Sequence, residues 1–299
     1  MLELLIIAAA NPIEHVVDKP VGEVLTMHVI TMGVVGALLV VTMMMAANAI
    51  ATGPESQGNE RFITKGRFAQ LIEVMVTFMI EQVFKPQLGE RTMKFAPLLL
   101  TLFFFILYHN VFGLVPLIDF QHLLGIHDPF IGGTATGNIA VTAALALVTF
   151  FVVQITGLRN LGPVNFLKHF MGGAPAYLAP IMVPVEILGT FIKPFALAIR
   201  LFANMTAGHV LLATLLMFCG LGVKALGPIF GGGITLVSIV ASVAIMFLEL
   251  FVAFLQAFIF TFLTTLFIGQ FLHHHHDEHE HGHDHAHDQH GHPAKAHAH

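Results

Sequence analysis

The stretch KPFALAIRLFANMTAGHVLL, from Lys193 to Leu212, places Arg200 in the middle of apolar side chains. The apolar run around it extends from Val185 to Phe218, and a second run extends from Gly233 to Leu272. A helix needs only about 20 apolar residues to cross a hydrocarbon core of about 30 Å. Helices over these two runs approach about 50–60 Å. Because excess length is accommodated by tilt, we expect two long, strongly tilted helices that lie against each other.

The composition places most of the chain in lipid. Of its 299 residues, 56% are hydrophobic and 10% are charged, with a mean hydropathy of +0.81. A soluble domain is about a quarter charged. Three further apolar runs, 24–50, 95–118 and 138–157, have the length of single crossings. The sequence therefore predicts an all-α integral membrane protein with five transmembrane helices, over residues 24–272.

Residues 62–84 form a different kind of helix, with one charged face and one apolar face. Its apolar side chains recur at spacings of three and four, at Phe68, Leu71, Ile72, Met75, Phe78 and Met79. This pattern favours an amphipathic helix that lies in the membrane interface, the sixth helix of the domain. A helix packed on a soluble partner is the alternative.

The basic residues of the loops predict the orientation. Two lysines, Lys19 and Lys224, fall on one side of the five crossings, and the other side carries Arg61, Lys65, Arg67, Lys85, Arg91, Lys94, Arg159, Lys168 and Lys295. Basic residues stay on the cytoplasmic side. We therefore expect residues 1–23 to be extracytoplasmic and the C-terminus to be cytoplasmic.

The C-terminal segment 273–299 is a His-rich tail, HHHHDEHEHGHDHAHDQHGHPAKAHAH. Such low-complexity composition is typical of disorder. Its His, Asp and Glu side chains are suited to weak binding of transition metals, although a solvated segment without a role is an equal alternative. We expect no cofactor, no other metal site and no nucleic-acid partner.

The two long helices each carry polar residues on one side. On the first, Glu186, Lys193, Arg200 and Asn204 share a face at 100° per residue, whereas His209 faces the other way. On the second, Ser242, Glu249 and Gln256 recur every seven residues and form one stripe. Ionisable groups at membrane depth are costly and therefore indicate function. Together the two sides predict a polar seam that water or protons can use.

RLFANMTAGHVLL (200–212) and FLQAFIFTFLTTLFIG (254–269) resemble subunit a of the F-type rotary ATP synthase, and FGLVP (112–116) and TGNIAVTAALAL (136–147) fit the same family. The resemblance implies a stator in the membrane sector, without catalytic chemistry of its own. It conducts protons through two offset half-channels to and from the carboxylates of a rotor ring of c subunits. It also implies peripheral-stalk b subunits as partners and a bacterial inner membrane as the location.

By this resemblance, Arg200 faces each passing rotor carboxylate, with Asn204 and Gln256 close by. His209 and Glu249 match a Glu and His pair of the family, here in the reverse order. Glu186 matches the acidic residue of the cytoplasmic half-channel, and Asn110 matches a polar residue of the outside half-channel. A fixed arginine charge favours the deprotonated carboxylate and repels protons, so it blocks a direct leak.

Several side chains have simpler interpretations. Arg200 can be a structural arginine, His209 a satisfied buried histidine, and Glu186 the mark of a helix start. Asn204 and Gln256 can hold helices together at about 1 kcal/mol each, and Lys193 fits best as a snorkelling side chain. At the level of the whole chain, the alternatives are a self-contained ion-coupled transporter, with Arg200 binding an anion, or a structural membrane anchor. The choice between H⁺ and Na⁺ stays open.

Overall fold

The computed structural model describes residues 26–50, 64, 66–115, 117, 121, 125, 132, 135–169 and 176–280. All elements within these ranges are helical. The α-helices are α2 (Met27–Ile50), α3 (Arg67–Phe78), α4 (Lys85–Leu88), α5 (Thr92–Gly113), α7 (Ile139–His169) and α8 (Ala179–Glu280). Shorter turns are the π-helical η2 (Met79–Phe84) and the 3₁₀ turns η3 (Gly89–Arg91), η4 (Ala135–Gly137) and η5 (Ala176–Leu178). The predicted segment 1–23 lies outside the described residues.

Five of these helical stretches are long and apolar enough to cross a membrane. They are Met27–Ala49, Arg67–Gly113, Ile139–Phe166, Pro180–Leu215 and Gly231–Leu272. The last two contain 36 and 42 residues, which corresponds to about 54 and 63 Å of helix. The prediction of an all-α membrane protein with five long apolar helices is confirmed.

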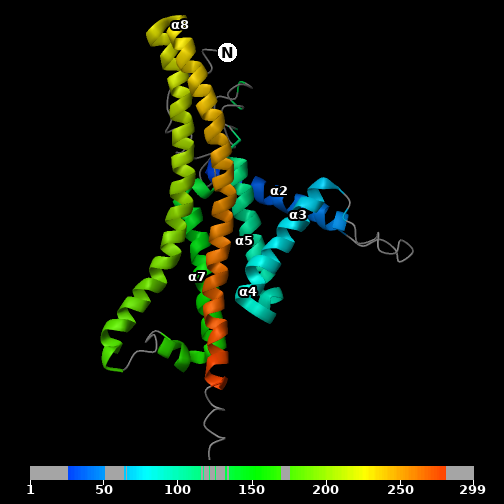
Figure 1. Ribbon diagram of the computed structural model, residues 1–299, viewed down its shortest axis with the longest axis vertical. Coiled ribbons are helices and arrows are strands. Elements are labelled where there is room, and N and C mark those ends of the chain that lie inside the picture. The colour runs from blue at the N-terminus through cyan, green and yellow to red at the C-terminus, as the bar shows by residue number, and fades with distance from the viewer. Residues whose placement is uncertain are drawn as a thin grey trace, which may run out of the picture.

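The longest element, α8, is a hairpin of two helical arms. Gly227 separates them with non-helical backbone angles, φ 73° and ψ 178°, a conformation that costs little only without a Cβ. We call residues 179–226 the first arm and residues 228–280 the second arm. The two arms run side by side in Figure 1, and the first arm bends away from the second toward its green end. Pro194 lies in this bent half of the first arm, where a proline favours a bend.

The amphipathic segment and the next helix form a second, shorter hairpin. Helix α3 continues through the π-helical η2 into α4, and the chain reverses at Gly89, whose φ of 56° suits glycine. Helix α5 then runs back through the molecule. On α3, only Ala69 and Ile72 are buried, whereas the large apolar side chains Phe68, Leu71, Val74 and Phe78 are exposed.

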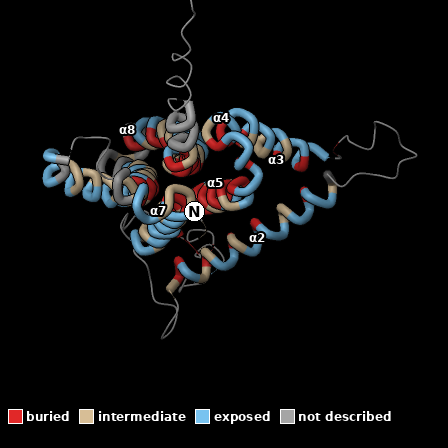
Figure 2. The backbone as a smooth tube through the Cα atoms, turned by 90° about the horizontal axis from the view of Figure 1, so that it is seen from below, coloured by how far each residue is buried: buried red, intermediate tan, exposed pale blue. Residues whose placement is uncertain are grey.

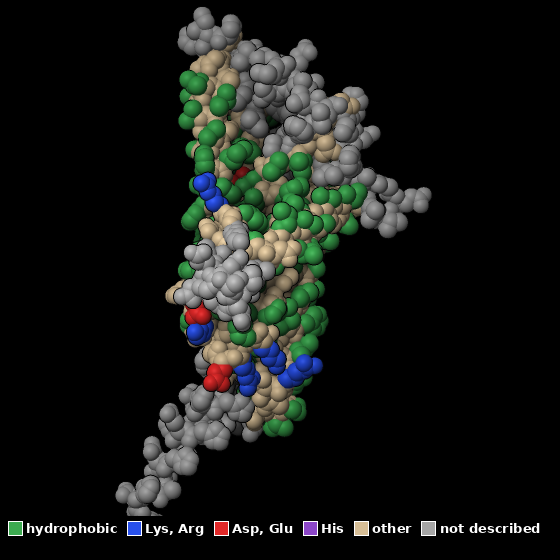
Figure 3. All heavy atoms as spheres, turned by 90° about the vertical axis from the view of Figure 1, so that its right-hand side faces the viewer, with side chains coloured by type: hydrophobic (Ala, Val, Ile, Leu, Met, Phe, Trp, Pro, Cys, Tyr) green, Lys and Arg blue, Asp and Glu red, His purple; other side chains and the backbone are tan. Residues whose placement is uncertain are grey.

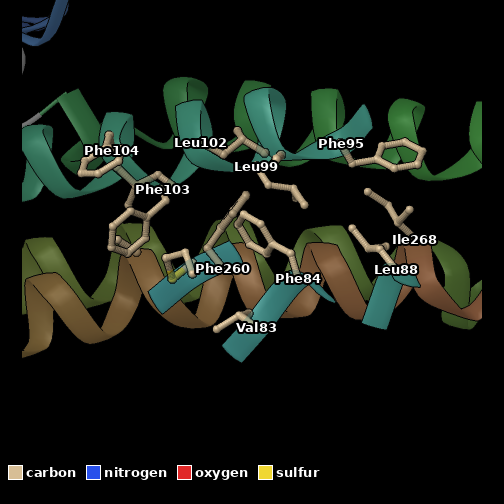
Figure 4. Close-up of a cluster of buried hydrophobic side chains, with 14 of the residues drawn as sticks. Val83, Phe84, Leu88, Phe95, Leu99, Leu102, Phe103, Phe104, Phe260 and Ile268 are labelled. Carbon is tan, nitrogen blue, oxygen red and sulfur yellow. The ribbon is translucent and has the colours of Figure 1, made fainter. Parts of the chain in front are cut away.

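The core lies where α5, η2 and α4 pack against the second arm of α8. Figure 4 shows aromatic and aliphatic side chains from these elements pointing toward one another. Phe103 of α5 meets Phe254 of the second arm edge-on, with 5.9 Å between the ring centroids. The largest buried members of the core are Phe84, Leu99, Phe103, Ile106, Phe260 and Ile268.

Helix α2 has a different direction from the other long helices. Its axis makes a wide angle with the arms of α8 in Figure 1, and much of its surface is exposed in Figure 2. Its buried side follows Thr31, Val35, Leu39 and Ala46. One hydrogen bond, from Thr42 Oγ1 to Tyr108 Oη at 3.0 Å, ties it to α5.

Several helix boundaries differ from those expected. Helix α5 spans Thr92–Gly113 instead of 95–118, and α7 continues to His169 instead of ending at 157, with a kink at Gly162 (φ 74°) before Pro163. The first arm begins at Ala179, six residues before the expected start at 185. The second arm continues to Glu280, eight residues into the tail that we expect to be disordered from 273. Extending an existing helix requires no new nucleation, so apolar runs underestimate helix length.

A contact between α4 and the second arm can be tested at Gly269. A Cβ at this position would lie 2.7 Å from the backbone oxygen of Gln87, and a backbone atom cannot rotate away. We expect Gly269→Ala to destabilise the protein by about 1–3 kcal/mol, measured as a lower thermal unfolding midpoint of the purified complex. Gly233→Ala is the control, because nothing lies within 4 Å of its Cβ. Equal midpoints for the two variants would contradict the contact.

Candidate functional site

The first arm of α8 carries Arg200 on its exposed side. Arg200 is exposed together with the small residues Ala196, Ala203 and Ala207 on the same face. The opposite side of this arm is buried at Leu197, Leu201 and Met205. Arg200 forms no hydrogen bond or ion pair with any residue that the structure describes. A permanent positive charge therefore lies on an exposed face of an apolar helix, and the neighbouring side chains on that face are small.

The polar stripe of the second arm faces the interior of the protein. Ser242, Glu249 and Gln256 are only 7%, 5% and 4% exposed. Their buried polar atoms lack hydrogen-bond partners among the described residues: Ser242 Oγ, both carboxylate oxygens of Glu249, and Gln256 Nε2. Leaving such groups unpaired costs about 1–3 kcal/mol each. A stripe of this kind is suited to interaction with water or with a moving ion.

The two arms are in close contact where Gly208 meets Glu249. A Cβ added to Gly208 would overlap Oε1 of Glu249, and the carboxyl carbon would lie 2.8 Å from it. The absence of a side chain at Gly208 thus gives the Glu249 carboxylate its place against the first arm. His209 follows Gly208 directly and is half-buried. The predicted pairing of His209 with Glu249 stays a prediction.

Asn110 joins three elements at the end of α5. Its side chain is fully buried. Its Nδ2 donates to the Ala253 carbonyl of the second arm at 3.4 Å, and its Oδ1 accepts from Thr136 Oγ1 of η4 at 2.8 Å. Ala253 lies one helical turn after Glu249. Asn110 is therefore positioned one turn away from the contact between the arms.

Glu186 lines a separate polar cavity between α7 and both arms of α8. Its polar lining consists of Thr149, Gln154, Glu186, Thr190, Lys193 and Gln270. The cavity volume of about 40 Å³ is enough for a few water molecules, since one needs about 10–15 Å³. The hydroxyl of Thr149 is buried without a partner among the described residues, and a water molecule in the cavity would satisfy it.

Lys193 belongs to this cavity instead of extending to a lipid headgroup. Its Nζ lies 5.3 Å from the centroid of the Phe267 ring, a cation–π contact between the two arms. Lys193 and Glu186 line the same cavity but do not form an ion pair with each other. Opposite charges separated by a polar cavity are compatible with water between them.

The structure distributes the sequence-predicted residues over three places. Glu249 lies at the contact between the arms, with Asn110 one turn away, His209 next to Gly208 in the chain and Gln256 on the same stripe as Glu249, and Glu186 lies in the cavity near α7. Arg200 and Asn204 lie on the first arm between these places, exposed and half-buried respectively. Neither Arg200 nor Gln256 forms a hydrogen bond with a described residue, so their predicted proximity stays a prediction.

Sequence reasoning missed Gly208, Thr149 and His109. Gly208 directly precedes His209, which was a usable signal, whereas Thr149 lies in an apolar run where hydroxyls commonly bond their own helix. His109 precedes Asn110 in the chain and is buried. No group of three or more His, Cys, Asp or Glu in the described ranges is arranged to hold a metal ion. The His-rich segment after Glu280 lies outside those ranges.

The family model described as ATP synthase A chain matches residues 25–269. The chain belongs to the ATP synthase subunit a family. It is 40% identical over 250 residues to ATP synthase subunit a of Myxococcus xanthus (strain DK1622), which covers 82% of this chain and 72% of that protein. It is 41% identical over 251 residues to ATP synthase subunit a of Chloroherpeton thalassium (strain ATCC 35110 / GB-78), covering 84% and 67%.

A third relative is ATP synthase subunit a 2 of Prosthecochloris aestuarii (strain DSM 271 / SK 413), 40% identical over 250 residues and covering 84% of this chain and 69% of that protein. As a subunit a, the chain is an integral component of the membrane sector of the H⁺-transporting ATP synthase, with a stator role and no catalytic site of its own.

The contact between Gly208 and Glu249 predicts a mutational effect. Gly208→Ala displaces the carboxylate, and misplacement by about 1 Å can reduce a rate by about a hundredfold. We therefore expect a large loss of ATP-driven proton pumping in inverted membrane vesicles. Glu249→Asp, which is shorter by one methylene, should restore part of the pumping in the Gly208→Ala background.

Gly189→Ala serves as the control on the same arm, because nothing lies within 4 Å of its Cβ. Equal pumping by Gly208→Ala and Gly189→Ala would show that the carboxylate does not occupy this place.

Proposed function

We propose that the chain conducts protons through two offset half-channels to and from the carboxylates of a rotor ring of c subunits. Arg200 lies between the two half-channels and prevents a proton short circuit. The observation that carries this proposal is the position of Arg200, exposed on the first arm beside Ala196, Ala203 and Ala207. Small side chains allow a neighbouring helix to come close. A carboxylate on that neighbour supplies the negative partner that the charge requires.

The outer half-channel is formed by Asn110, Glu249, His209 and Gln256. The buried carboxylate of Glu249 and amide of Gln256, which have unpaired atoms within the described ranges, support a path through which water and protons move. Glu249 and His209 are groups that gain and lose protons, which a relay needs. Asn204 lies one turn from Arg200 on the first arm and helps to position the rotor carboxylate.

The inner half-channel begins at the cavity that Glu186 lines. This cavity lies between α7 and the arms and contains both Glu186 and Lys193. Its volume and polar lining support water within it, and Glu186 exchanges protons between that water and the cytoplasm. The Glu186 cavity and the Glu249 stripe are distinct groups of residues along the arms, which supports two offset paths.

Arg200 controls the exchange between the two paths. An arginine stays protonated in proteins, so it cannot pass a proton on. Its charge favours the deprotonated form of each rotor carboxylate, so a proton must leave before the carboxylate passes. The same charge repels protons that would move directly between the half-channels. Protons therefore cross only when the ring rotates.

We place the protein in a bacterial inner membrane with the N-terminus outside and the C-terminus in the cytoplasm. The charged side chains visible in Figure 3 gather mainly toward its lower end, below a broad hydrophobic surface. Arg67, Lys85, Arg91, Lys94 and Arg159 are all exposed, and basic residues favour the cytoplasmic side. The arms are longer than a bilayer is thick and make a wide angle with α2, which supports strong tilt in the membrane.

The remaining surfaces suit lipid and stalk partners. The exposed Phe68, Leu71, Val74 and Phe78 of α3 support a helix that lies in the membrane interface. Peripheral-stalk b subunits complete the stator around the chain. The translocated ion is H⁺, and the rotor carboxylate site sets the selectivity against Na⁺.

The decisive variant is Arg200→Ala. We expect ATP synthesis and ATP-driven proton pumping in inverted vesicles to fall by at least about a hundredfold, the scale of losing one essential electrostatic group. Arg159→Ala, which also removes an exposed positive charge, should retain both activities. Co-purification of the rotor ring checks assembly. Retained activity in Arg200→Ala, or transport by the chain without any ring, would favour a self-contained ion-coupled transporter instead.

Glu186→Gln tests the inner half-channel. The amide keeps the shape of the side chain but cannot carry a proton. A positioned proton-transfer group contributes a factor of about a hundred to a rate. We expect the rate of ATP synthesis to fall by less than this factor, because water in the cavity still conducts protons. Glu81→Gln is the control, since Glu81 is an exposed carboxylate paired with Lys85 at 2.9 Å. An unchanged rate in Glu186→Gln would remove this residue from the path.

A further inference from the structure

The polar cavity that Glu186 lines contains a buried hydroxyl that the proposed inner half-channel does not use. Thr149 contributes it from α7, and this side chain is only 2% exposed. Threonine hydroxyls inside helices commonly bond a carbonyl oxygen of their own helix. Thr142 on α7 and Thr190 on the first arm do so, at 3.1 and 2.9 Å. Thr149 Oγ1 has no partner among the described residues, so its hydroxyl is available to a molecule in the cavity.

Thr149 lies at the end of the cavity that is deeper in the membrane. The rings of Phe150 and Phe191 stack with 5.3 Å between their centroids, which sets the register between α7 and the first arm at this level. Thr149 directly precedes Phe150, and Lys193 follows Phe191 by two residues. In the proposed orientation α7 runs toward the cytoplasm and the first arm runs away from it. Thr149 and Lys193 therefore both lie deeper than the stacked rings.

Glu186 lies at the other end of the same cavity, nearer the cytoplasm. It precedes Lys193 by seven residues, or about 10 Å of helix. Gln154 of α7 and Gln270 of the second arm also line the cavity. Gln270 is exposed, whereas Glu186 and Gln154 are half-buried. Because Thr149 is buried, the cavity is most accessible at its cytoplasmic end and closed at its deep end.

The deep end of the cavity combines the hydroxyl of Thr149 with the charge of Lys193. The Lys193 ammonium is held by its contact with the Phe267 ring of the second arm. An ammonium only donates hydrogen bonds, whereas a hydroxyl both donates and accepts. A water molecule at this end can therefore accept a hydrogen bond from Lys193 and donate one to Thr149, which orients it. Arg200 lies on the same face of the first arm as Lys193, about 10 Å further into the membrane.

We infer that Thr149 is a positioning residue of the inner half-channel, whose hydroxyl holds the water that exchanges protons with Glu186. In the direction of ATP synthesis, this water accepts a proton that arrives from the level of Arg200 and becomes hydronium. A carboxylate oxygen of Glu186 takes up that proton through the remaining water of the cavity, and the water at Thr149 is restored. The inference rests on the proposed function and adds α7 to its inner half-channel.

Two substitutions at Thr149 separate water binding from packing. Thr149→Val keeps the shape of the side chain and removes the hydroxyl, whereas Thr149→Ser keeps the hydroxyl and removes a methyl group. We expect Thr149→Val to slow ATP synthesis in inverted vesicles about three- to tenfold, the scale on which one hydrogen bond changes a rate. Thr149→Ser should retain about the wild-type rate. A packing role predicts the reverse order, because the smaller side chain leaves a void, and either the reverse order or equal rates would overturn the inference.

Thr142→Val is the matched control on the same helix. Thr142 is fully buried two turns before Thr149, and its hydroxyl bonds the carbonyl oxygen of Ile139 instead of lining the cavity. The same loss of a hydroxyl should therefore leave the rate of ATP synthesis near that of the wild type. Equal slowing by Thr142→Val and Thr149→Val would show that any buried hydroxyl lost from α7 is harmful, and the inference would fail.

A second measurement asks directly whether water reaches position 149 from the cytoplasmic side. Thr149→Cys is combined with Cys219→Ser, which removes the single cysteine of the chain, and silver ion is added outside inverted vesicles. A thiolate binds metal ions and forms readily only where water reaches it. Silver should therefore inhibit ATP synthesis by this variant but not by Thr142→Cys or by Cys219→Ser alone. Absence of inhibition would overturn the inference even where Thr149→Val does not assemble with the rotor ring.

The proposed function is judged separately, by Arg200→Ala and Glu186→Gln. If both of these variants lose synthesis while Thr149→Val retains it, the role of Thr149 is wrong and the two half-channels stand. If Arg200→Ala retains synthesis, the half-channels themselves are wrong, whatever the result at Thr149.

Discussion

The two arms of α8 meet where the Glu249 carboxylate rests against the backbone of Gly208. A side chain at position 208 would overlap this carboxylate, so the contact depends on glycine. Arg200 lies on the exposed face of the first arm, and the stripe of the second arm faces inward. The aromatic core between α5 and the second arm stabilises this arrangement.

Unpaired polar atoms are usually a defect in a protein interior, but here several of them lie on the polar stripe and in the Glu186 cavity. Ser242, Glu249 and Gln256 of the stripe and Thr149 of the cavity contribute buried polar atoms without hydrogen-bond partners in the described part of the chain. At about 1–3 kcal/mol for each unsatisfied group, a soluble protein would eliminate such positions. A proton path requires groups that accept transient partners, so permanent hydrogen bonds at these sites would oppose conduction.

The sequence predicted the elements well because membrane helices are specified by local hydropathy. The apolar runs around Arg200 and Glu249 predicted two helices that are longer than a bilayer is thick. The spacing of seven residues predicted that Ser242, Glu249 and Gln256 share one side of their helix. The sequence did not predict contacts between distant segments. The fit of Glu249 against Gly208 and the cavity beside Glu186 both depend on a neighbouring helix. The ends of α7 and α8 were missed because helices continue into polar sequence once they have formed.

The turn at Gly227 fixes how many residues separate Gly208 on the first arm from Glu249 on the second arm. The hairpin joins them directly, so a residue inserted between Gly227 and Glu249 rotates the carboxylate by roughly 100° and shifts it by about 1.5 Å relative to Gly208. The same holds for an insertion between Gly208 and Gly227. A substitution along the arms changes one side chain. A single insertion or deletion changes the direction in which the whole polar stripe of the second arm points. The contact between Gly208 and Glu249 therefore tolerates most single substitutions between these positions better than it tolerates a change in the number of residues.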